Sequence, residues 1–167
     1  MGAGKTTIGR EIARRRGIPF FDSDHEIVAR TGVSIPNIFA VEGEAGFRRR
    51  ESEMLDELTG KAEVVIATGG GVVLDPDSRA LMARRGIVVY LDVPPYILWE
   101  RIRNDRNRPL LNVERPRQRI ETLYRERDPL YREVADIIVG GGRSYPGAMV
   151  RQIEQALSTF KKSSCVS

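Results

Sequence analysis

Residues 1–7 read Met-Gly-Ala-Gly-Lys-Thr-Thr, and this stretch decides how the rest of the chain is interpreted. It matches the second half of a phosphate-binding loop, whose full pattern is G-x-x-x-x-G-K-[ST]. The backbone amides of such a loop surround a phosphate, its lysine reaches the β- and γ-phosphates, and the next hydroxyl binds Mg²⁺. A helix directly after the loop points its positive end at the same phosphates. The stretch therefore predicts that Lys5 and Thr6 contact nucleotide phosphates and their metal ion.

The front of this pattern, its first glycine and the buried strand that precedes it, is not part of the sequence. A glycine-rich tail ahead of an ordinary helix is therefore the competing interpretation. We expect a central strand of the sheet to be missing, which would expose two strand edges, open a core cavity and leave the loop poorly anchored. We interpret Met1 as a start placed too late in the reading frame, the alternative being a genuine but impaired protein.

The composition is that of a globular chain of 167 residues with 41% hydrophobic residues, which predicts one domain. No apolar run is long enough to span a bilayer, and no signal peptide is recognisable. A single cysteine, Cys165, and a single histidine, His25, exclude a disulfide framework and a four-ligand Cys/His zinc site. We expect a cytoplasmic monomer without a membrane partner, with one domain over 1–160 and a disordered tail over 161–167.

The chain carries a net charge of +4 and has a sequence pI near 9.5, so a nucleic-acid-binding protein is a rival interpretation. Aromatic residues make up only 7% of the chain, and no basic patch is interleaved with them. Most arginines are therefore expected on solvated helix faces, and no nucleic-acid partner is expected.

Apolar strand runs alternate with helical patterns throughout the chain. The expected strands cover 18–22, 64–67, 87–92 and 136–139. The expected helices cover 5–16, 34–58, 77–86, 94–103, 118–127 and 146–160. This alternation predicts right-handed βαβ units and a three-layer α/β fold, in which helices cover both faces of a parallel sheet.

Two aspartates, Asp22 and Asp24, follow the first apolar run. Ligands of open α/β sheets bind at the carboxyl ends of the strands, and residues two apart on an extended backbone point to the same side. The two carboxylates could therefore serve a metal ion and a substrate hydroxyl. In the alternative interpretation, Asp22 or Ser23 only caps the helix that begins near Asp24.

Three further segments carry functional signals. The glycines at 69–71 follow a buried strand and predict close approach of the backbone to a ligand. Residues 104–116 fit neither helix nor strand periodicity and are rich in arginine, which predicts a lid that closes over anions. At most two of the three arginines at 48–50 can face a site, because adjacent helical residues point in different directions.

Six motifs, in this order, resemble the shikimate kinase family over residues 1 to about 160. They are Gly4-Lys5-Thr6, Asp22-x-Asp24, Gly46-Phe47-Arg48-x-x-Glu51, Gly69-Gly70-Gly71, Arg108-Pro109-Leu110-Leu111 and Arg127-x-Pro129-Leu130-Tyr131. The resemblance implies a P-loop kinase fold with strand order 2-3-1-4-5, from which the first strand is missing here. It also implies transfer of the γ-phosphoryl group of ATP to the 3-hydroxyl of shikimate, in the chorismate pathway of aromatic amino-acid biosynthesis.

The resemblance further implies the roles of individual residues. Nucleotide contacts fall on Met1, Gly2, Ala3, Gly4, Lys5, Thr6, Arg101, Arg108, Ser144 and Pro146. Mg²⁺ contacts fall on Thr6 and Asp22, and shikimate contacts on Asp24, Arg48, Gly69, Gly70, Gly71 and Arg127. Catalysis falls on Lys5 and Arg108, which would offset phosphoryl charge, and on Asp24, which would orient the acceptor hydroxyl. Ser144 departs from the family, which often has a basic residue there.

Two alternatives remain at this point. A related P-loop kinase could act on another small hydroxy acid such as gluconate, although the Arg48 and Arg127 pair favours shikimate. A regulatory or nucleic-acid-binding homologue with impaired catalysis would account for the positive charge.

Overall fold

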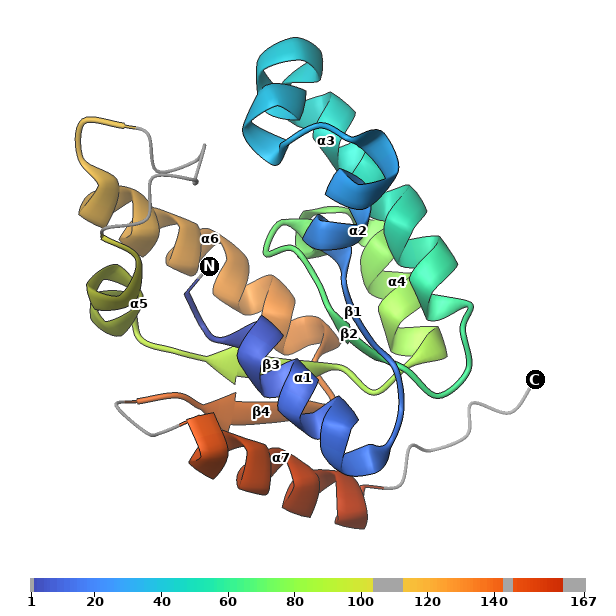
Figure 1. The fold of residues 1–167 in the computed structure, drawn as a ribbon. Helices are drawn as coiled ribbons and strands as arrows, with labels where there is room; N and C mark the ends of the chain where they lie inside the picture. Colours follow the sequence, from blue (N-terminus) through green and yellow to red (C-terminus); the bar gives the residue numbers. More distant parts are fainter. Residues whose placement is uncertain (1, 104–112, 143–145, 161–167) are drawn as a thin grey trace.

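The computed structural model describes residues 2–103, 113–142 and 146–160, which form alternating helices and strands (Figure 1). The helices are α1 (Lys5–Arg16), α2 (Ser23–Thr31), α3 (Ile35–Thr59), α4 (Pro76–Arg85), α5 (Pro95–Ile102), α6 (Pro116–Val134) and α7 (Pro146–Thr159), with a short 3₁₀ helix, η1, at Val72–Leu74. The strands are β1 (Phe20–Asp22), β2 (Val65–Ala67), β3 (Val89–Asp92) and β4 (Ile137–Gly140). The α/β class predicted from the sequence is confirmed.

The strands form two separate parallel pairs. β1 pairs with β2, placing Asp22 beside Ala67, and β3 pairs with β4, placing Asp92 beside Gly140. The single continuous sheet of the predicted three-layer fold is therefore not seen among the described residues.

A groove with mostly apolar walls separates β2 from β3. One wall comes from Val65 and Ala67 of β2 and the other from Val89 and Leu91 of β3. Within the described ranges, each of these strands hydrogen-bonds to only one neighbouring strand. The backbone edges that face the groove therefore have no strand partner there, and edges of this kind readily accept another strand.

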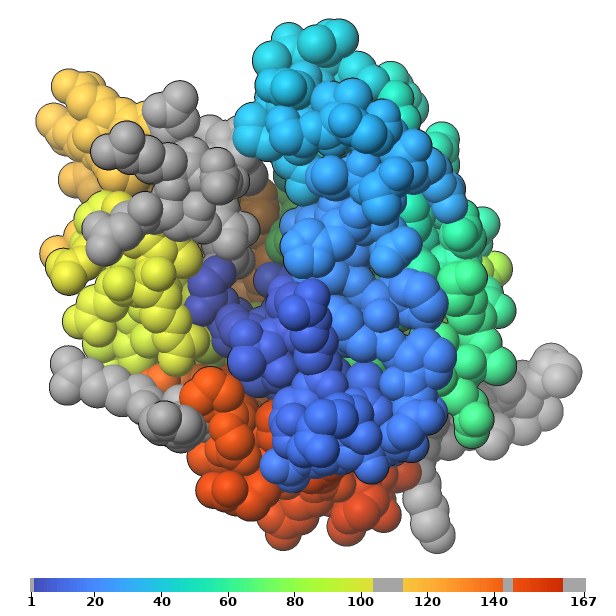
Figure 2. Space-filling model, viewed as in Figure 1, coloured from blue at the N-terminus to red at the C-terminus, as the bar shows by residue number. Residues whose placement is uncertain are grey.

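Helices cover both sides of the strand pairs. α1 and α7 pack together against β4 around Ile8, Val139 and Ile153. On the other side, α3, α4 and α6 enclose Leu55, Met82 and their apolar neighbours. Figure 2 shows the start of the chain at the centre of one face, beside α5 and above α7. This arrangement holds residues 2–6 where several elements meet.

Several element boundaries differ from those predicted. α6 continues through Pro129 to Val134, although the sequence placed its end near Arg127. Pro129 and Arg125, four residues earlier, are both exposed, so solvent can replace the hydrogen bond that proline cannot donate. α3 runs as one element through a kink at Gly43, whose φ of 69° is left-handed and suits glycine.

Some predictions fall outside the described residues: those for Met1, Arg108 and Ser144, most of the lid and the tail over 161–167. In the part of the chain that the structure describes, no helix combines the length and apolar character needed to cross a membrane.

Candidate active site

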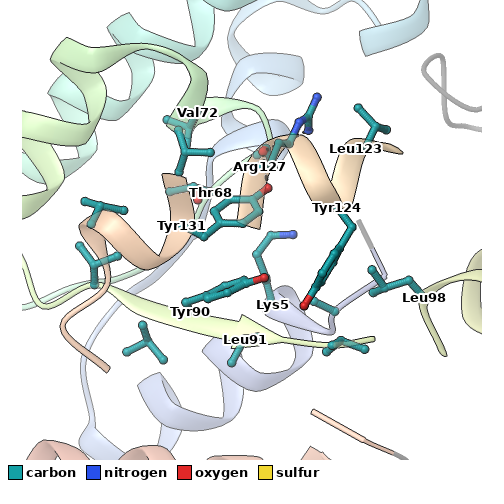
Figure 3. A pocket seen from close by; sticks show the side chains of 18 of the residues that line it. Lys5, Thr68, Val72, Tyr90, Leu91, Leu98, Leu123, Tyr124, Arg127 and Tyr131 are labelled. Atoms are coloured by element: carbon teal, nitrogen blue, oxygen red, sulfur yellow. Dashed lines mark hydrogen bonds between the residues drawn. The ribbon is translucent and has the colours of Figure 1, made fainter. Parts of the chain in front are cut away.

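The phosphate-loop residues lead directly into α1. Gly4 adopts a left-handed conformation with φ of 90°, and Gly2 one with φ of 68°, so both positions favour glycine. Lys5 is the first residue of α1, and its side chain points into a pocket that Thr68, Arg127 and Tyr131 also line (Figure 3). The loop, the helix N-terminus and the lysine thus meet as the motif predicts.

Thr6 and Asp22 lie together at the carboxyl end of β1. Thr6 Oγ1 donates a hydrogen bond of 2.6 Å to Asp22 Oδ2. Asp22 Oδ1 accepts from the backbone N–H groups of Asp24 at 3.2 Å and His25 at 3.4 Å, so the aspartate also caps α2. The capping interpretation of Asp22 is therefore correct, and the other carboxylate oxygen faces the phosphate loop, whereas its role toward a metal ion stays a prediction.

Asp24 reaches the site by a different route from the one predicted. α2 already begins at Ser23, so the argument from an extended backbone is wrong for Asp24. The residue is nevertheless close to the glycine segment, because its Oδ1 lies 2.9 Å from where a Gly69 Cβ would be. Ser23 Oγ accepts a hydrogen bond of 3.0 Å from the Gly69 N–H. This buried contact joins the ends of β1 and β2 and fixes the position of Asp24 beside them.

The glycines at 69 and 71 are required by neighbouring side chains. A Cβ at Gly71 would overlap the Arg48 guanidinium, and one at Gly69 would overlap the Glu51 carboxylate. The sequence predicted close approach to a ligand, whereas the observed neighbours are protein side chains from α3. The absence of side chains on the loop is what allows Arg48 to lie against its backbone.

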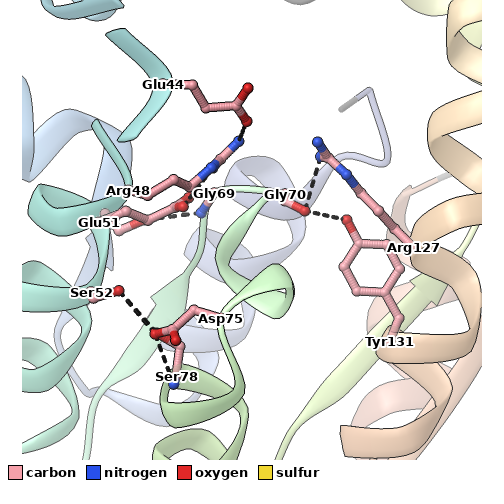
Figure 4. A network of polar contacts seen from close by, with 11 residues as sticks. Glu44, Arg48, Glu51, Ser52, Gly69, Gly70, Asp75, Ser78, Arg127 and Tyr131 are labelled. Atoms are coloured by element: carbon pink, nitrogen blue, oxygen red, sulfur yellow. Dashed lines mark hydrogen bonds and ion pairs between the residues drawn. The ribbon is translucent and has the colours of Figure 1, made fainter. Parts of the chain in front are cut away.

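Arg48 is held by two carboxylates. Its Nη1 donates to Glu51 Oε2 at 2.6 Å and its Nη2 to Glu44 Oε1 at 2.8 Å (Figure 4). Glu51 is 2% exposed, and its burial raises the pKa of its carboxyl group while Arg48 opposes that rise. Arg49 is exposed and Arg50 pairs with Glu42, so only one of the three arginines faces the site, as predicted.

Arg127 approaches the same loop from α6. It is 6% exposed, and its Nη1 donates a hydrogen bond of 3.2 Å to the Gly70 carbonyl oxygen. The Tyr131 hydroxyl donates to the same oxygen at 2.5 Å. Figure 4 shows Arg48 and Arg127 on opposite sides of the glycine segment. Glu51 and Tyr131 are the contributors to which sequence reasoning gave no role, although both stand in the quoted motifs.

Among the residues that the structure describes, some polar atoms at this site have no hydrogen-bond partner. They include Nε of Arg48, Nε of Arg127 and Oε1 of Glu51, all of them buried. Buried polar groups in native proteins are almost always hydrogen-bonded, so each such group calls for an explanation. A polar ligand with anionic character would satisfy the two guanidinium groups.

Arg101 connects the elements expected around the nucleotide base. Its Nη1 donates to the Gly2 carbonyl at 3.2 Å and its Nη2 to the Gly142 carbonyl at 3.4 Å. Pro146 is the first residue of α7, which follows the segment after β4. Arg101 therefore brings the phosphate loop close to the turn that leads toward α7.

Comparison with known proteins agrees with these features. The model of the family "Shikimate kinase" matches residues 1–158. The shikimate kinase of Aromatoleum aromaticum is 70% identical over 165 residues, which cover 99% of this chain and 94% of that protein. The shikimate kinase of Dechloromonas aromatica is 56% identical over 153 residues, or 92% of this chain and 84% of that protein.

Solved structures give the same result. The shikimate kinase of Acinetobacter baumannii, solved in complex with shikimate, is 46% identical with a TM-score of 0.93, covering 96% of this chain and 91% of that one. The shikimate kinase of Aquifex aeolicus is 40% identical with a TM-score of 0.83, covering 95% of this chain and 92% of that one. The family match spans nearly the whole described chain, and the chain therefore belongs to the shikimate kinase family of ATP-dependent phosphotransferases.

Proposed function

We propose that Arg48 and Arg127 bind the carboxylate of shikimate between them, while Asp24 and the glycines at 69–71 contact its ring hydroxyls. The observation that carries this proposal is the pair of buried guanidinium groups on either side of the glycine segment, each with an unpartnered Nε. A planar guanidinium suits a carboxylate because it can donate two parallel hydrogen bonds. The Acinetobacter baumannii structure, a complex with shikimate, supports this choice of ligand.

The proposed mechanism is positioning combined with charge neutralisation. Asp24 orients the 3-hydroxyl of shikimate toward the γ-phosphoryl group of ATP and accepts its proton late in the transfer. Lys5, at the N-terminus of α1, neutralises charge on the transferred group, and Arg108 of the lid assists. Phosphoryl transfer needs no covalent enzyme intermediate, so groups that position the substrates and neutralise charge are the types of residue that the reaction requires.

The oxygen atoms at the end of β1 fit a magnesium ion. Thr6 and Asp22 supply a hydroxyl and a carboxylate, and they lie 2.6 Å apart at the phosphate loop. Mg²⁺ usually binds through one or two protein oxygens together with waters and substrate phosphates. The described residues contain no group of three or more His, Cys, Asp or Glu that could hold a metal ion by themselves. When bound, Mg²⁺ would neutralise phosphate charge.

The finer features of the fold are part of the same proposal. The observed pairs β1–β2 and β3–β4 correspond to strands 2-3 and 4-5 of the order 2-3-1-4-5, with the groove at the place of the first strand. Residues 1–160 would form a single domain that acts as a cytoplasmic monomer.

A coupled ADP-release assay with shikimate and gluconate as alternative acceptors tests this function. We expect ADP release to depend on shikimate, and Lys5→Met to abolish it without a change in the circular dichroism spectrum. Faster turnover with gluconate would refute the substrate assignment. Full activity of Lys5→Met would refute the phosphate-loop assignment.

A further inference from the structure

The carbonyl oxygen of Gly70 accepts hydrogen bonds from two side chains of α6. Arg127 donates through Nη1 at 3.2 Å, and Tyr131 donates through its hydroxyl at 2.5 Å. The two donors stand four residues apart, one turn of the helix, and therefore project from the same face of α6. Figure 4 shows both reaching the glycine segment from the same side.

The Tyr131 ring packs against the ring of Tyr90 of β3. The two rings are stacked, with centroids 4.9 Å apart and an interplanar angle of 28°. The Tyr90 hydroxyl donates a hydrogen bond of 3.0 Å to Asp128 Oδ1 of α6, and the ring stack does not depend on this bond. Burial raises the pKa of the Tyr131 hydroxyl, which keeps it protonated and able to donate.

Arg127 serves Gly70 with Nη1, while its unpartnered Nε leaves another edge of the guanidinium for a substrate carboxylate. The same side chain would therefore connect the glycine segment to the substrate. Any turn of Arg127 toward a substrate would weaken its bond to the partly buried Gly70 carbonyl, which costs free energy. The shorter bond from Tyr131 to the same oxygen removes this cost.

We propose that Tyr131 is a positioning residue for the acceptor substrate: it keeps the Gly70 carbonyl hydrogen-bonded and the glycine segment in place when Arg127 turns to the substrate carboxylate. This inference rests on the proposed roles of Gly70 and Arg127. Tyr131 makes no contact with the substrate in this account. Its removal acts through Arg127 and Gly70.

The test compares two variants that each lose one phenolic oxygen. Tyr131→Phe removes the bond to Gly70, whereas Tyr90→Phe removes a bond of similar burial to Asp128 and keeps the ring stack. Thermal melts, steady-state kinetics and calorimetric titration of shikimate are measured for both. We expect Tyr131→Phe to raise the shikimate KM and Kd about five- to tenfold, the loss expected for one hydrogen bond. The ATP KM should stay within about twofold, and Tyr90→Phe should leave the shikimate KM within the same margin.

A double variant shows whether Tyr131 and Arg127 act on the same carbonyl. Arg127→Ala leaves Tyr131 as the remaining side-chain donor to Gly70 among the described residues. Adding Tyr131→Phe should therefore weaken shikimate binding by more than the sum of the two single changes. Independent, additive effects would overturn the inference, as would an unchanged shikimate KM in Tyr131→Phe or an equal rise in Tyr90→Phe. A failure of the proposed function is distinguishable, because Arg127→Ala alone would then leave the shikimate KM unchanged.

Discussion

Thr6 Oγ1 and Asp22 Oδ2 are joined by a hydrogen bond of 2.6 Å, which connects the first turn of α1 to the end of β1. The second oxygen of Asp22 caps α2, so one side chain serves the phosphate loop and a helix N-terminus together. The metal site and the start of α2 are therefore built from the same carboxylate.

Asp22→Asn separates these two roles. Asparagine caps helices about as well as aspartate, so the melting temperature should change little. The loss of the negative charge should raise the Mg²⁺ concentration for half-maximal activity about 10–100-fold, the usual cost of changing a group that supports a metal ligand. A magnesium titration of ADP release measures this, and an unchanged midpoint would remove Asp22 from the metal site.

Arg127→Ala should raise the shikimate KM far more than the ATP KM. Removing one partner of a buried charge pair typically costs about 2–5 kcal/mol, and Arg127 is 6% exposed. Arg125→Ala is the matched control, because Arg125 lies on the exposed face of the same helix. Steady-state kinetics with each substrate varied would distinguish the sites. A rise confined to ATP would place Arg127 on the nucleotide.

Asp75 should make folding stability depend on pH. It caps α4, and hydrogen bonds from Ser78 and Ser52 lower the pKa of its carboxyl below the ordinary value of 3.8. Because the unfolded chain binds a proton more readily, this contribution is present above pH 3.8 and disappears as the pH falls through the lowered value.

The variant Asp75→Ala isolates that contribution. It should lower the free energy of unfolding by about 1–2 kcal/mol at neutral pH, the usual cost of losing a helix cap. The difference from wild type should shrink as the pH falls below 3.8 and through the lowered pKa, because the carboxyl then becomes protonated. Urea unfolding at neutral pH and at a series of pH values below 3.8 measures both differences. A difference that does not depend on pH would show that the charged form is not what stabilises the cap.

The groove between β2 and β3 should accept an additional strand. Its walls are apolar, and the strands on either side have no other partner across it in the described part of the chain. An extension ahead of Met1 that encodes a short apolar β-run and a glycine should therefore raise both the melting temperature and the activity, because it would pair the two edges and anchor the phosphate loop. A polar extension of equal length is the control. Equal melting temperatures for the apolar and the polar extension would contradict the prediction that the groove accepts a strand.

Local patterns predicted the parts of the structure that depend on local chemistry. α1 covers 5–16 as predicted and ends at Gly17 in a left-handed conformation, and the apolar run before Asp22 forms β1. The extension of α6 through Pro129 was missed because a proline usually ends a helix. Solvent exposure, which makes this proline tolerable, is a tertiary property.

The missed site contributions also depend on tertiary contacts. Glu51 and Tyr131 stand in recognisable motifs, but their roles come from Arg48 one turn earlier and from Gly70 on a distant segment. The glycines at 69 and 71 were predicted to allow the close approach of a ligand, whereas the groups observed beside them are Arg48 and Glu51. A single sequence indicates that space is needed at these positions, and only the fold identifies what fills it.

The most direct test of the account is the position of shikimate in a crystal structure of this chain with shikimate and ADP–Mg²⁺. The account predicts the shikimate carboxylate between the guanidinium groups of Arg48 and Arg127, and its 3-hydroxyl within hydrogen-bond distance of Asp24. A carboxylate bound away from both arginines, or a 3-hydroxyl directed away from Asp24, would contradict it.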